Sequence, residues 1–235
     1  MNVLILGSGG REHCFAELIS KSKSCDKLFV APGNSGTSLV AENLDISPTD
    51  FDLVKGAIVQ HNIQLVVVGP EDPLVRGIHD FIISDPILKG VKVIGPKQKA
   101  AQLEGSKDFA KNFLNRHNIP TAKHKTFTTR QFEEACEYID NNSPPYVLKA
   151  DGLAAGKGVL IIDKPNQAKD ELYQMLVKSK FGVASSSVVI EEFLEGIELS
   201  CFVLTDGKNY KILPSAKDYK RIGEGDTGLN TGGMG

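Results

Sequence analysis

The sequence predicts an α/β fold, in which an open parallel sheet forms the N-terminal part and a smaller α+β region follows it. Two observations predict the sheet. In residues 1–100 short, wholly apolar runs alternate with helical patterns, and each run ends in a turn that contains glycine or proline. A third observation predicts the change of class, because strand-like runs with hairpin-type turns follow helical patterns after about residue 101.

The expected parallel strands are residues 3–6, 28–30, 65–68 and 91–94, and the expected helices lie around residues 15–19, 51–61 and 74–83. Strands that are apolar throughout are typical of a sheet with helices on both faces. The turns after these strands are residues 7–10, 32–34, 69–71 and 95–96. Because open parallel sheets bind ligands at the carboxyl ends of their strands, these turns are the expected binding region.

The second part is expected to be antiparallel. Helices are predicted at residues 106–116, where Ser106 is a suitable cap, and at 129–139 and 167–177. Strands are predicted at residues 146–149, 159–162, 188–191, 199–204 and 210–213, with Asp206-Gly207 as a hairpin turn. Residues 223–235 are rich in glycine and are predicted to form a loop.

The composition is that of an ordinary soluble globular protein. The net charge is −2, which gives no electrostatic reason to expect nucleic acid or a membrane surface as a partner. No apolar stretch approaches the roughly 18 residues of a membrane span. Cys14, Cys25, Cys136 and Cys201 lie far apart and fit neither a metal site nor a redox pair. We therefore expect reduced thiols in a cytoplasmic protein.

The turn Gly7-Ser8-Gly9-Gly10 follows a strand and opens a helix, an arrangement that suits an anion. A nicotinamide or flavin site is the obvious alternative. However, the spacing is G-x-G-G rather than G-x-G-x-x-G, and the only nearby acid, Asp26, precedes the second strand instead of ending it. A purely structural turn is the other alternative. We favour a small molecule that carries a phosphate group.

Residues 149–159 form the most specific segment: a strand ending in Lys149 runs through a Gly/Ala loop with Lys157 into another strand. It differs from a P-loop in spacing, in the missing Ser or Thr after Lys157 and in the strand that follows. Such a loop suits a lid over a triphosphate, and the alternative is a mobile hairpin with solvated lysines. The acidic turn at residues 191–198 suits a nucleoside, since a ribose diol needs a carboxylate, although acids in a turn are usually just solvated.

Taken in order, these segments resemble the ATP-grasp superfamily and, within it, the glycinamide ribonucleotide synthetase family. The resemblance covers essentially all 235 residues. The matching segments are residues 7–13, 31–34, 68–71, 101–107, 119–122, 149–159 and 230–235.

The resemblance implies a ligase of de novo purine biosynthesis that joins glycine to phosphoribosylamine and cleaves ATP to ADP and phosphate through a glycyl phosphate. It implies a monomer that needs ATP and Mg²⁺ or Mn²⁺. The metal ligands are expected after residue 235, and none in this chain.

The resemblance also implies roles for individual residues. ATP is expected at Lys107, Lys149, Gly152, Gly156, Lys157, Gly158, Glu191, Phe193, Leu194 and Glu198. Phosphoribosylamine is expected at Gly9, Gly10, Arg11, Glu71, Asp218, Lys220, Asn230, Thr231 and Gly232. The expected catalytic residues are Lys149, Lys157 and Arg221. The chain departs from the family pattern at Lys217, Tyr219 and Leu229, in the expected substrate loop.

Two domains follow from the resemblance: a Rossmann-like pre-ATP-grasp domain at residues 1–103, and the N-terminal part of an ATP-grasp domain at 104–235 with its lid at about 120–190. We interpret the C-terminus as a truncation, so the chain alone is expected to be inactive. The alternatives are another ATP-grasp ligase of purine biosynthesis, an NAD-dependent oxidoreductase and a non-catalytic binding module.

Overall fold

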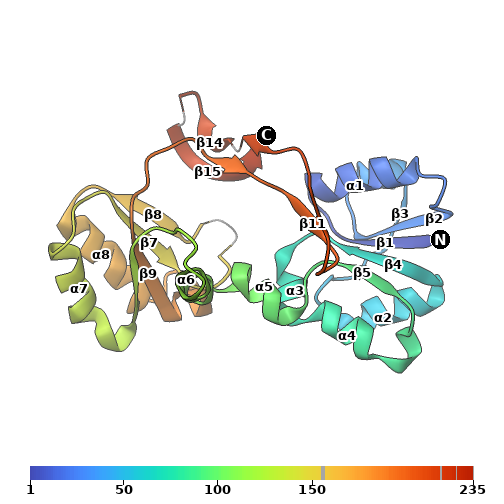
Figure 1. The fold of residues 1–235 in the computed structure, drawn as a ribbon, viewed down its shortest axis with the longest axis horizontal. Helices are drawn as coiled ribbons and strands as arrows, with labels where there is room; N and C mark the ends of the chain where they lie inside the picture. Colours follow the sequence, from blue (N-terminus) through green and yellow to red (C-terminus); the bar gives the residue numbers. More distant parts are fainter. Residues whose placement is uncertain (155–156, 218, 226, 235) are drawn as a thin grey trace. The chain divides into compact units, whose positions relative to one another are not determined.

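The computed structural model describes residues 1–154, 157–217, 219–225 and 227–234, and for residues 220, 221 and 228–234 it describes the backbone alone. The chain forms two compact units, a first unit of residues Met1–Ala110 and a second unit of residues Lys111–Gly235. Figure 1 shows both units, the first coloured from blue to green and the second from green through yellow to red. The α/β fold predicted from the sequence is confirmed.

The first unit is built on a five-stranded sheet with the order β3-β2-β1-β4-β5. Its strands are β1 (Asn2–Gly7), β2 (Lys27–Pro32), β3 (Glu42–Asn43), β4 (Ile63–Val68) and β5 (Lys92–Ile94). All pairs are parallel, and Ile5 of the central strand pairs with Val30 on one side and Val67 on the other. Of these five strands the sequence analysis missed β3 alone, because two residues carry no periodic signal.

Helices cover both faces of this sheet, as strands that are apolar throughout require. They are α1 (Gly10–Ser20), α2 (Phe51–Gln60), α3 (Glu71–Arg76), α4 (Ile78–Ser84) and α5 (Gln98–Gly105). Leu4 and Leu6 pack in the core with α2 and α4, whereas Val3 and Ile5 pack in a second core with Ala16 of α1. The single helix expected around residues 74–83 is wrong, since Gly77 adopts a φ of 100° and separates α3 from α4.

The second unit contains a four-stranded antiparallel sheet with the order β6-β9-β7-β8. Its strands are β6 (His124–Thr128), β7 (Tyr146–Ala150), β8 (Val159–Ile162) and β9 (Ser187–Glu192). Helices α7 (Phe132–Asp140) and α8 (Pro165–Leu176) cover one face, where Phe127, Leu148 and Ile190 are buried with Leu172. Helix α6 (Lys107–Arg116) begins as predicted, with the Ser106 hydroxyl accepting a hydrogen bond from the Phe109 N–H.

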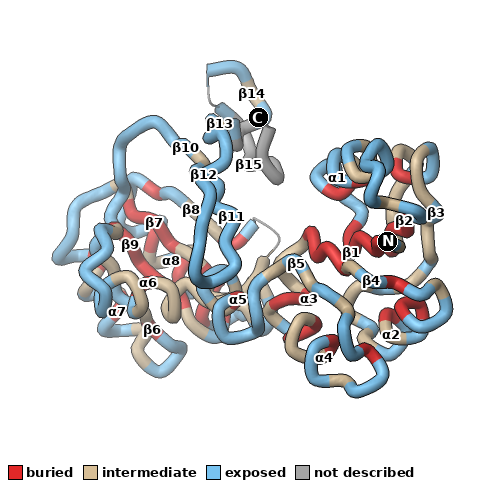
Figure 2. Tube along the Cα trace, turned by 45° about the vertical axis from the view of Figure 1, so that its right-hand side comes forward, coloured by how far each residue is buried: buried red, intermediate tan, exposed pale blue. Residues whose placement is uncertain are grey.

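Three two-stranded ribbons follow: β10 (Leu199–Ser200) with β13 (Ala216–Lys217), β11 (Val203–Thr205) with β12 (Tyr210–Ile212), and β14 (Tyr219–Gly223) with β15 (Thr227–Met234). The prediction of one strand over residues 199–204 and of a loop over 223–235 is therefore wrong. Backbone pairing alone forms β15, which needs no side-chain pattern in its glycine-rich sequence. In Figure 2 the tube from β10 to β12 is coloured as exposed.

Short 3₁₀ turns lie at Thr37–Leu39, Pro86–Leu88, Thr129–Gln131 and Gly182–Ser186. The four cysteines carry free thiols. In the part of the chain that the structure describes, every helix is too short or too polar to cross a membrane.

Candidate active site

The first candidate site is the carboxyl edge of the parallel sheet. Strand β1 lies between β2 and β4, so the chain leaves it to one side through α1 and returns on the other side through β4. A crevice at such a reversal of strand order is where open sheets bind ligands. The turns 7–10 and 69–71 flank this point. They carry Gly9, Gly10, Arg11 and Glu71, which the sequence analysis singled out.

Glu12 organises this edge, although the sequence analysis gave it no role. Its side chain is buried, and its Oε2 accepts a hydrogen bond of 2.6 Å from the Gly9 N–H. The side chain fills space that Gly7, Gly9 and Gly69 leave open, because a Cβ at any of the three would clash with it. A glycine at the N-cap followed three positions later by glutamate is a variant of the capping box, and this spacing was the signal in the sequence.

This contact changes how the glycine turn can be used. The Gly9 N–H already has a carboxylate acceptor, so it is not a free donor for an anion. Among the described residues the buried Glu12 Oε1 has no hydrogen-bond partner, and the Arg11 Nε lies 3.8 Å from it. A buried acceptor of this kind lowers the affinity of the turn for a second negative charge. Gly9 therefore serves this turn by leaving space for the Glu12 side chain, and its N–H is not available to a ligand.

Asn34 joins the turn after β2 to the turn after β1. Its side-chain amide donates to the Ser8 carbonyl oxygen at 2.9 Å, and its side-chain oxygen accepts from the N–H groups of Gly36 and Thr37. The two turns thus form one connected surface. Glu71 is the first residue of α3 and is half-buried.

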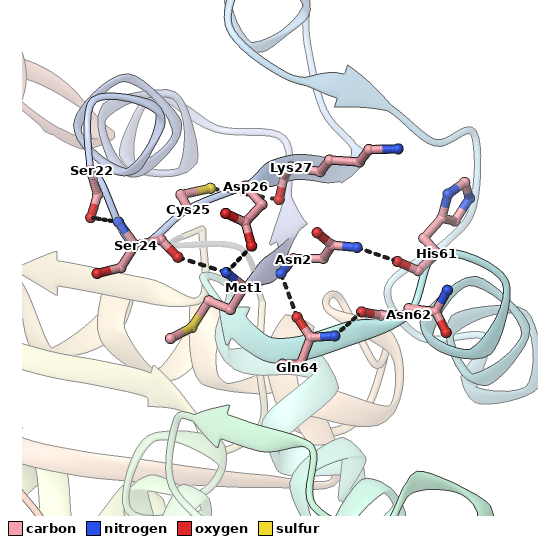
Figure 3. A network of polar contacts seen from close by, with 10 residues as sticks. All are labelled: Met1, Asn2, Ser22, Ser24, Cys25, Asp26, Lys27, His61, Asn62 and Gln64. Atoms are coloured by element: carbon pink, nitrogen blue, oxygen red, sulfur yellow. Dashed lines mark hydrogen bonds and ion pairs between the residues drawn. The ribbon is translucent and has the colours of Figure 1, made fainter.

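Asp26 lies at the opposite edge of the sheet, among the amino ends of the strands. Its carboxylate binds the Met1 ammonium group at 2.5 Å, and that ammonium also donates to the Ser24 carbonyl oxygen (Figure 3). Asn2 and Gln64 complete the same network. An acid at this edge is too far from the carboxyl ends to hold a ribose diol beside the glycine turn, which argues against a dinucleotide site.

The second candidate site lies on the sheet of the second unit, on the face opposite α7 and α8. Val147 pairs with Glu191, and Lys149 with Val189. Because side chains alternate along a strand, Lys149 and Glu191 share one face while Leu148 and Ile190 enter the core. The Lys149 Nζ lies 2.9 Å from the Glu191 Oε2. The fold thus brings together two residues that are 42 positions apart in the sequence.

A second lysine, Lys111, reaches the same carboxylate from α6. Its Nζ lies 3.2 Å from the Glu191 Oε2, and it donates to the Thr121 hydroxyl at 2.8 Å and to the Ala122 carbonyl oxygen at 3.4 Å. Lys111 is buried, and within the described part of the chain the Glu191 Oε1 has no hydrogen-bond donor. The sequence analysis missed Lys111 because a lysine in a polar helix normally faces solvent.

The loop between β7 and β8 is closely packed at its base. A Cβ on Gly158 would lie 2.8 Å from the Ala154 side chain, and one on Gly152 would lie 3.0 Å from the Ala184 backbone. The Lys157 N–H donates to the Ala154 carbonyl oxygen at 2.9 Å. The small residues are therefore required by packing as well as by any ligand. Lys157 itself is exposed.

Comparison with known protein families shows which family the chain belongs to. Residues 1–104 match the N domain of phosphoribosylglycinamide synthetase, and residues 105–235 match its ATP-grasp (A) domain. The chain belongs to the phosphoribosylglycinamide synthetase family. This is the glycinamide ribonucleotide synthetase family under another name, so the resemblance drawn from the sequence is confirmed.

Relatives within the phosphoribosylglycinamide synthetase family cover the whole chain. A phosphoribosylamine–glycine ligase of Haemophilus influenzae is 50% identical over 237 residues, which are 100% of this chain and 54% of that protein. The bifunctional purine biosynthetic protein PUR2,5 of Pichia angusta is 47% identical, again over 100% of this chain but 30% of the relative. The chain thus spans about half the length of the ligases it matches.

Solved structures agree with the family assignment. The phosphoribosylamine–glycine ligase of Thermotoga maritima has a TM-score of 0.78 at 34% identity, over 100% of this chain and 54% of that chain. An ADP complex of N5-carboxyaminoimidazole ribonucleotide synthetase has a TM-score of 0.68 at 18% identity, over 96% of this chain and 55% of that chain. The second likeness concerns the fold alone.

The remaining residues expected from the family pattern lie in several parts of the chain. Lys107 is the first residue of α6 and belongs to the first unit. Phe193, Leu194 and Glu198 are exposed in the segment after β9. Gly156 and Asp218 lie outside the described residues, and only the backbone is described for Lys220, Arg221, Asn230, Thr231 and Gly232, in β14 and β15.

Proposed function

We propose that this chain forms the ATP-binding and amine-binding half of a ligase that joins glycine to 5-phosphoribosylamine, giving glycinamide ribonucleotide, ADP and phosphate. Family membership supports the reaction class. The observation that carries the proposal is the Lys149–Glu191 pair on the face of the β6-β9-β7-β8 sheet opposite α7 and α8, next to the loop that holds Lys157.

In the proposed reaction a carboxylate oxygen of glycine attacks the γ-phosphorus of ATP and ADP leaves. The amine of phosphoribosylamine then attacks the glycyl carbonyl carbon and displaces phosphate. Both steps build negative charge on phosphoryl oxygens, which cations and fixed N–H groups stabilise without a protein nucleophile. Lys149 and Lys157 supply cations on one hairpin, and Arg221 remains the proposed third.

Glu191 suits the adenine end of the nucleotide. Its Oε2 contacts two lysines, whereas none of the described residues donates a hydrogen bond to its buried Oε1. An exocyclic amine would supply that donor. Phe193 and Leu194, which follow directly in the chain, offer exposed apolar side chains and backbone groups for the ring. Lys107, Gly152, Gly156, Gly158 and Glu198 complete the proposed nucleotide set.

In the first unit we propose that phosphoribosylamine lies over Gly10, Arg11 and Glu71. Because Glu12 already occupies the Gly9 N–H, the turn is better suited to hydroxyl or amine groups of the substrate than to its phosphate. Asp218, Lys220, Asn230, Thr231 and Gly232 remain proposed contacts of phosphoribosylamine, as the resemblance to the family implies.

The proposal includes Mg²⁺ or Mn²⁺. Among the residues that the structure describes, His, Cys, Asp and Glu side chains form no group of three that could hold such an ion. The described residues therefore do not fit the metal, and no step is assigned to it here.

The test joins residues 1–235 to the C-terminal half of the Haemophilus influenzae relative and measures phosphate release. Release should require glycine, phosphoribosylamine and ATP together, and Lys149→Ala should abolish most of it. The 235-residue chain alone should release none, since the resemblance places the metal ligands after residue 235. A folded fusion that releases phosphate without glycine, or none at all, would refute the proposal.

A further inference from the structure

Three charged side chains meet on the face of the second unit's sheet that lies opposite α7 and α8. Lys111 and Lys149 both contact the Glu191 Oε2, at 3.2 Å and 2.9 Å. The relative exposure of their side chains differs: 10% for Lys111, 28% for Lys149 and 5% for Glu191. One carboxylate therefore has two cations, although one would neutralise it.

The two lysines are held differently. Lys111 has two further partners, the Thr121 hydroxyl and the Ala122 carbonyl oxygen, which fix its ammonium group in the interior. Among the described residues Lys149 makes no hydrogen bond or ion pair besides the one with Glu191. Lys111 is therefore the anchored cation, and Lys149 is the cation that is free to turn.

A buried carboxylate that loses its last counter-ion is strongly destabilised. If Lys149 were the sole partner of Glu191, its movement toward a phosphate group would leave Glu191 buried and unpaired. The second lysine removes this penalty, because Glu191 stays paired when Lys149 leaves. The site then presents one surplus positive charge to an anion.

We propose that Lys111 is a positioning residue of the nucleotide site, which stays with Glu191 as its permanent counter-ion and so releases Lys149 to bind the phosphates. This rests on the proposed function only in naming the anion as ATP. The division of roles between the two lysines is a property of the chain without any ligand.

The test measures how fast the amine of each lysine is acetylated by acetic anhydride in the 235-residue chain, read by mass spectrometry. In Lys111→Met, Lys149 becomes the sole counter-ion, and its acetylation should slow roughly tenfold. In Glu191→Gln, and equally in Lys111→Met/Glu191→Gln, Lys149 should react at least as fast as in the unaltered chain. Equal rates in these two variants would show that Lys111 acts on Lys149 only through Glu191.

Lys169→Met is the control, because it removes a lysine from a different ion pair, the one with Asp140, away from this cluster. It should leave the acetylation of Lys149 unchanged. If Lys111→Met does not fold, the rates of Lys149 acetylation in Glu191→Gln and in the double variant still test the proposal. A difference in Lys149 acetylation between those two would overturn the proposal, as would unchanged acetylation in a folded Lys111→Met.

A second arm repeats the labelling in the fusion protein described above, with and without ATP. ATP should protect Lys149 in the unaltered fusion and protect it less in Lys111→Met. In the unaltered fusion Lys111 should stay unlabelled with and without ATP. Equal protection in both would overturn the proposal. Absence of protection in the unaltered fusion, with the ligand-free pattern intact, would refute the proposed function and leave the division of the lysines standing.

Discussion

Replacing Gly69 by alanine tests whether Glu12 locks the two turns at the carboxyl edge of the first unit. A Cβ at residue 69 would overlap the Glu12 carboxyl group and would lie 2.5 Å from its Cδ. The carboxyl group cannot yield without losing its 2.6 Å hydrogen bond from the Gly9 N–H. The substitution is therefore expected to destabilise the first unit.

The magnitude follows from three contributions. Overpacking of a tight interior site costs about 1–3 kcal/mol. Loss of a hydrogen bond to a charged group adds about 1.5–3 kcal/mol. The lower entropy of the unfolded alanine chain offsets about 0.4–1 kcal/mol. The net expectation is a loss of about 2–5 kcal/mol, a large share of the stability of a domain.

Urea unfolding followed by two signals measures this loss. The chain has no tryptophan, and its five tyrosines all lie in the second unit. Far-UV circular dichroism reports both units, whereas tyrosine fluorescence reports the second alone. Gly69→Ala should shift the circular dichroism transition and spare the fluorescence transition. Gly56→Ala is the control: a Cβ there meets nothing within 4 Å, so it should stabilise α2 by about 0.5–1 kcal/mol.

The reasoning also predicts a coupling. In a Glu12→Ala background the clash is absent, so Gly69→Ala should lose most of its effect. An undiminished loss in that background would show that the Glu12 contact is not the cause, and a loss below about 0.5 kcal/mol in the unaltered chain would refute the packing argument itself.

The remaining predictions concern other parts of the chain. In the fusion protein, Lys149→Ala should raise the KM for ATP and lower kcat. Lys157→Ala should mainly lower kcat, by about 10²–10³, because the loop lysine acts when charge develops on the transferred phosphoryl group. An unchanged kcat in Lys157→Ala would show that its loop is only a structural hairpin. Calorimetric titration should detect no NAD binding at the turn of residues 7–10, and micromolar affinity would reinstate the oxidoreductase alternative. Hydrogen bonds from the Asn209 and Lys208 N–H groups lower the pKa of Asp206 from 3.8 to about 2. The stability that the ionised Asp206 carboxylate gives the β11–β12 hairpin should therefore be complete above the unfolded pKa and should vanish as the pH falls from about 4 to 2. A ¹³C NMR titration of this carboxyl group should have its midpoint near 2. A midpoint near 3.8 would contradict those hydrogen bonds.

Local pattern and position in the chain were enough to predict the parallel sheet, because a strand buried on both faces must be apolar throughout. They also placed Lys149 and Glu191 at the ends of strands. The pairing of these two residues, and the arrival of Lys111 beside them, depends on how α6 packs, which no local pattern encodes. Gly77 was misjudged because a glycine within a helical pattern is often tolerated.

The distribution of buried side chains also sets an order of folding. Among the described residues, no side chain after Glu191 is buried, and the core of the second unit is complete at Ile190. A chain made from its N-terminus can therefore close both cores before the ribbons β10 to β15 are synthesised. Those ribbons are two-stranded and would be marginally stable alone. They are expected to form last and to open first. The backbone amides of these ribbons should therefore exchange their hydrogens quickly, while those of both sheets stay protected.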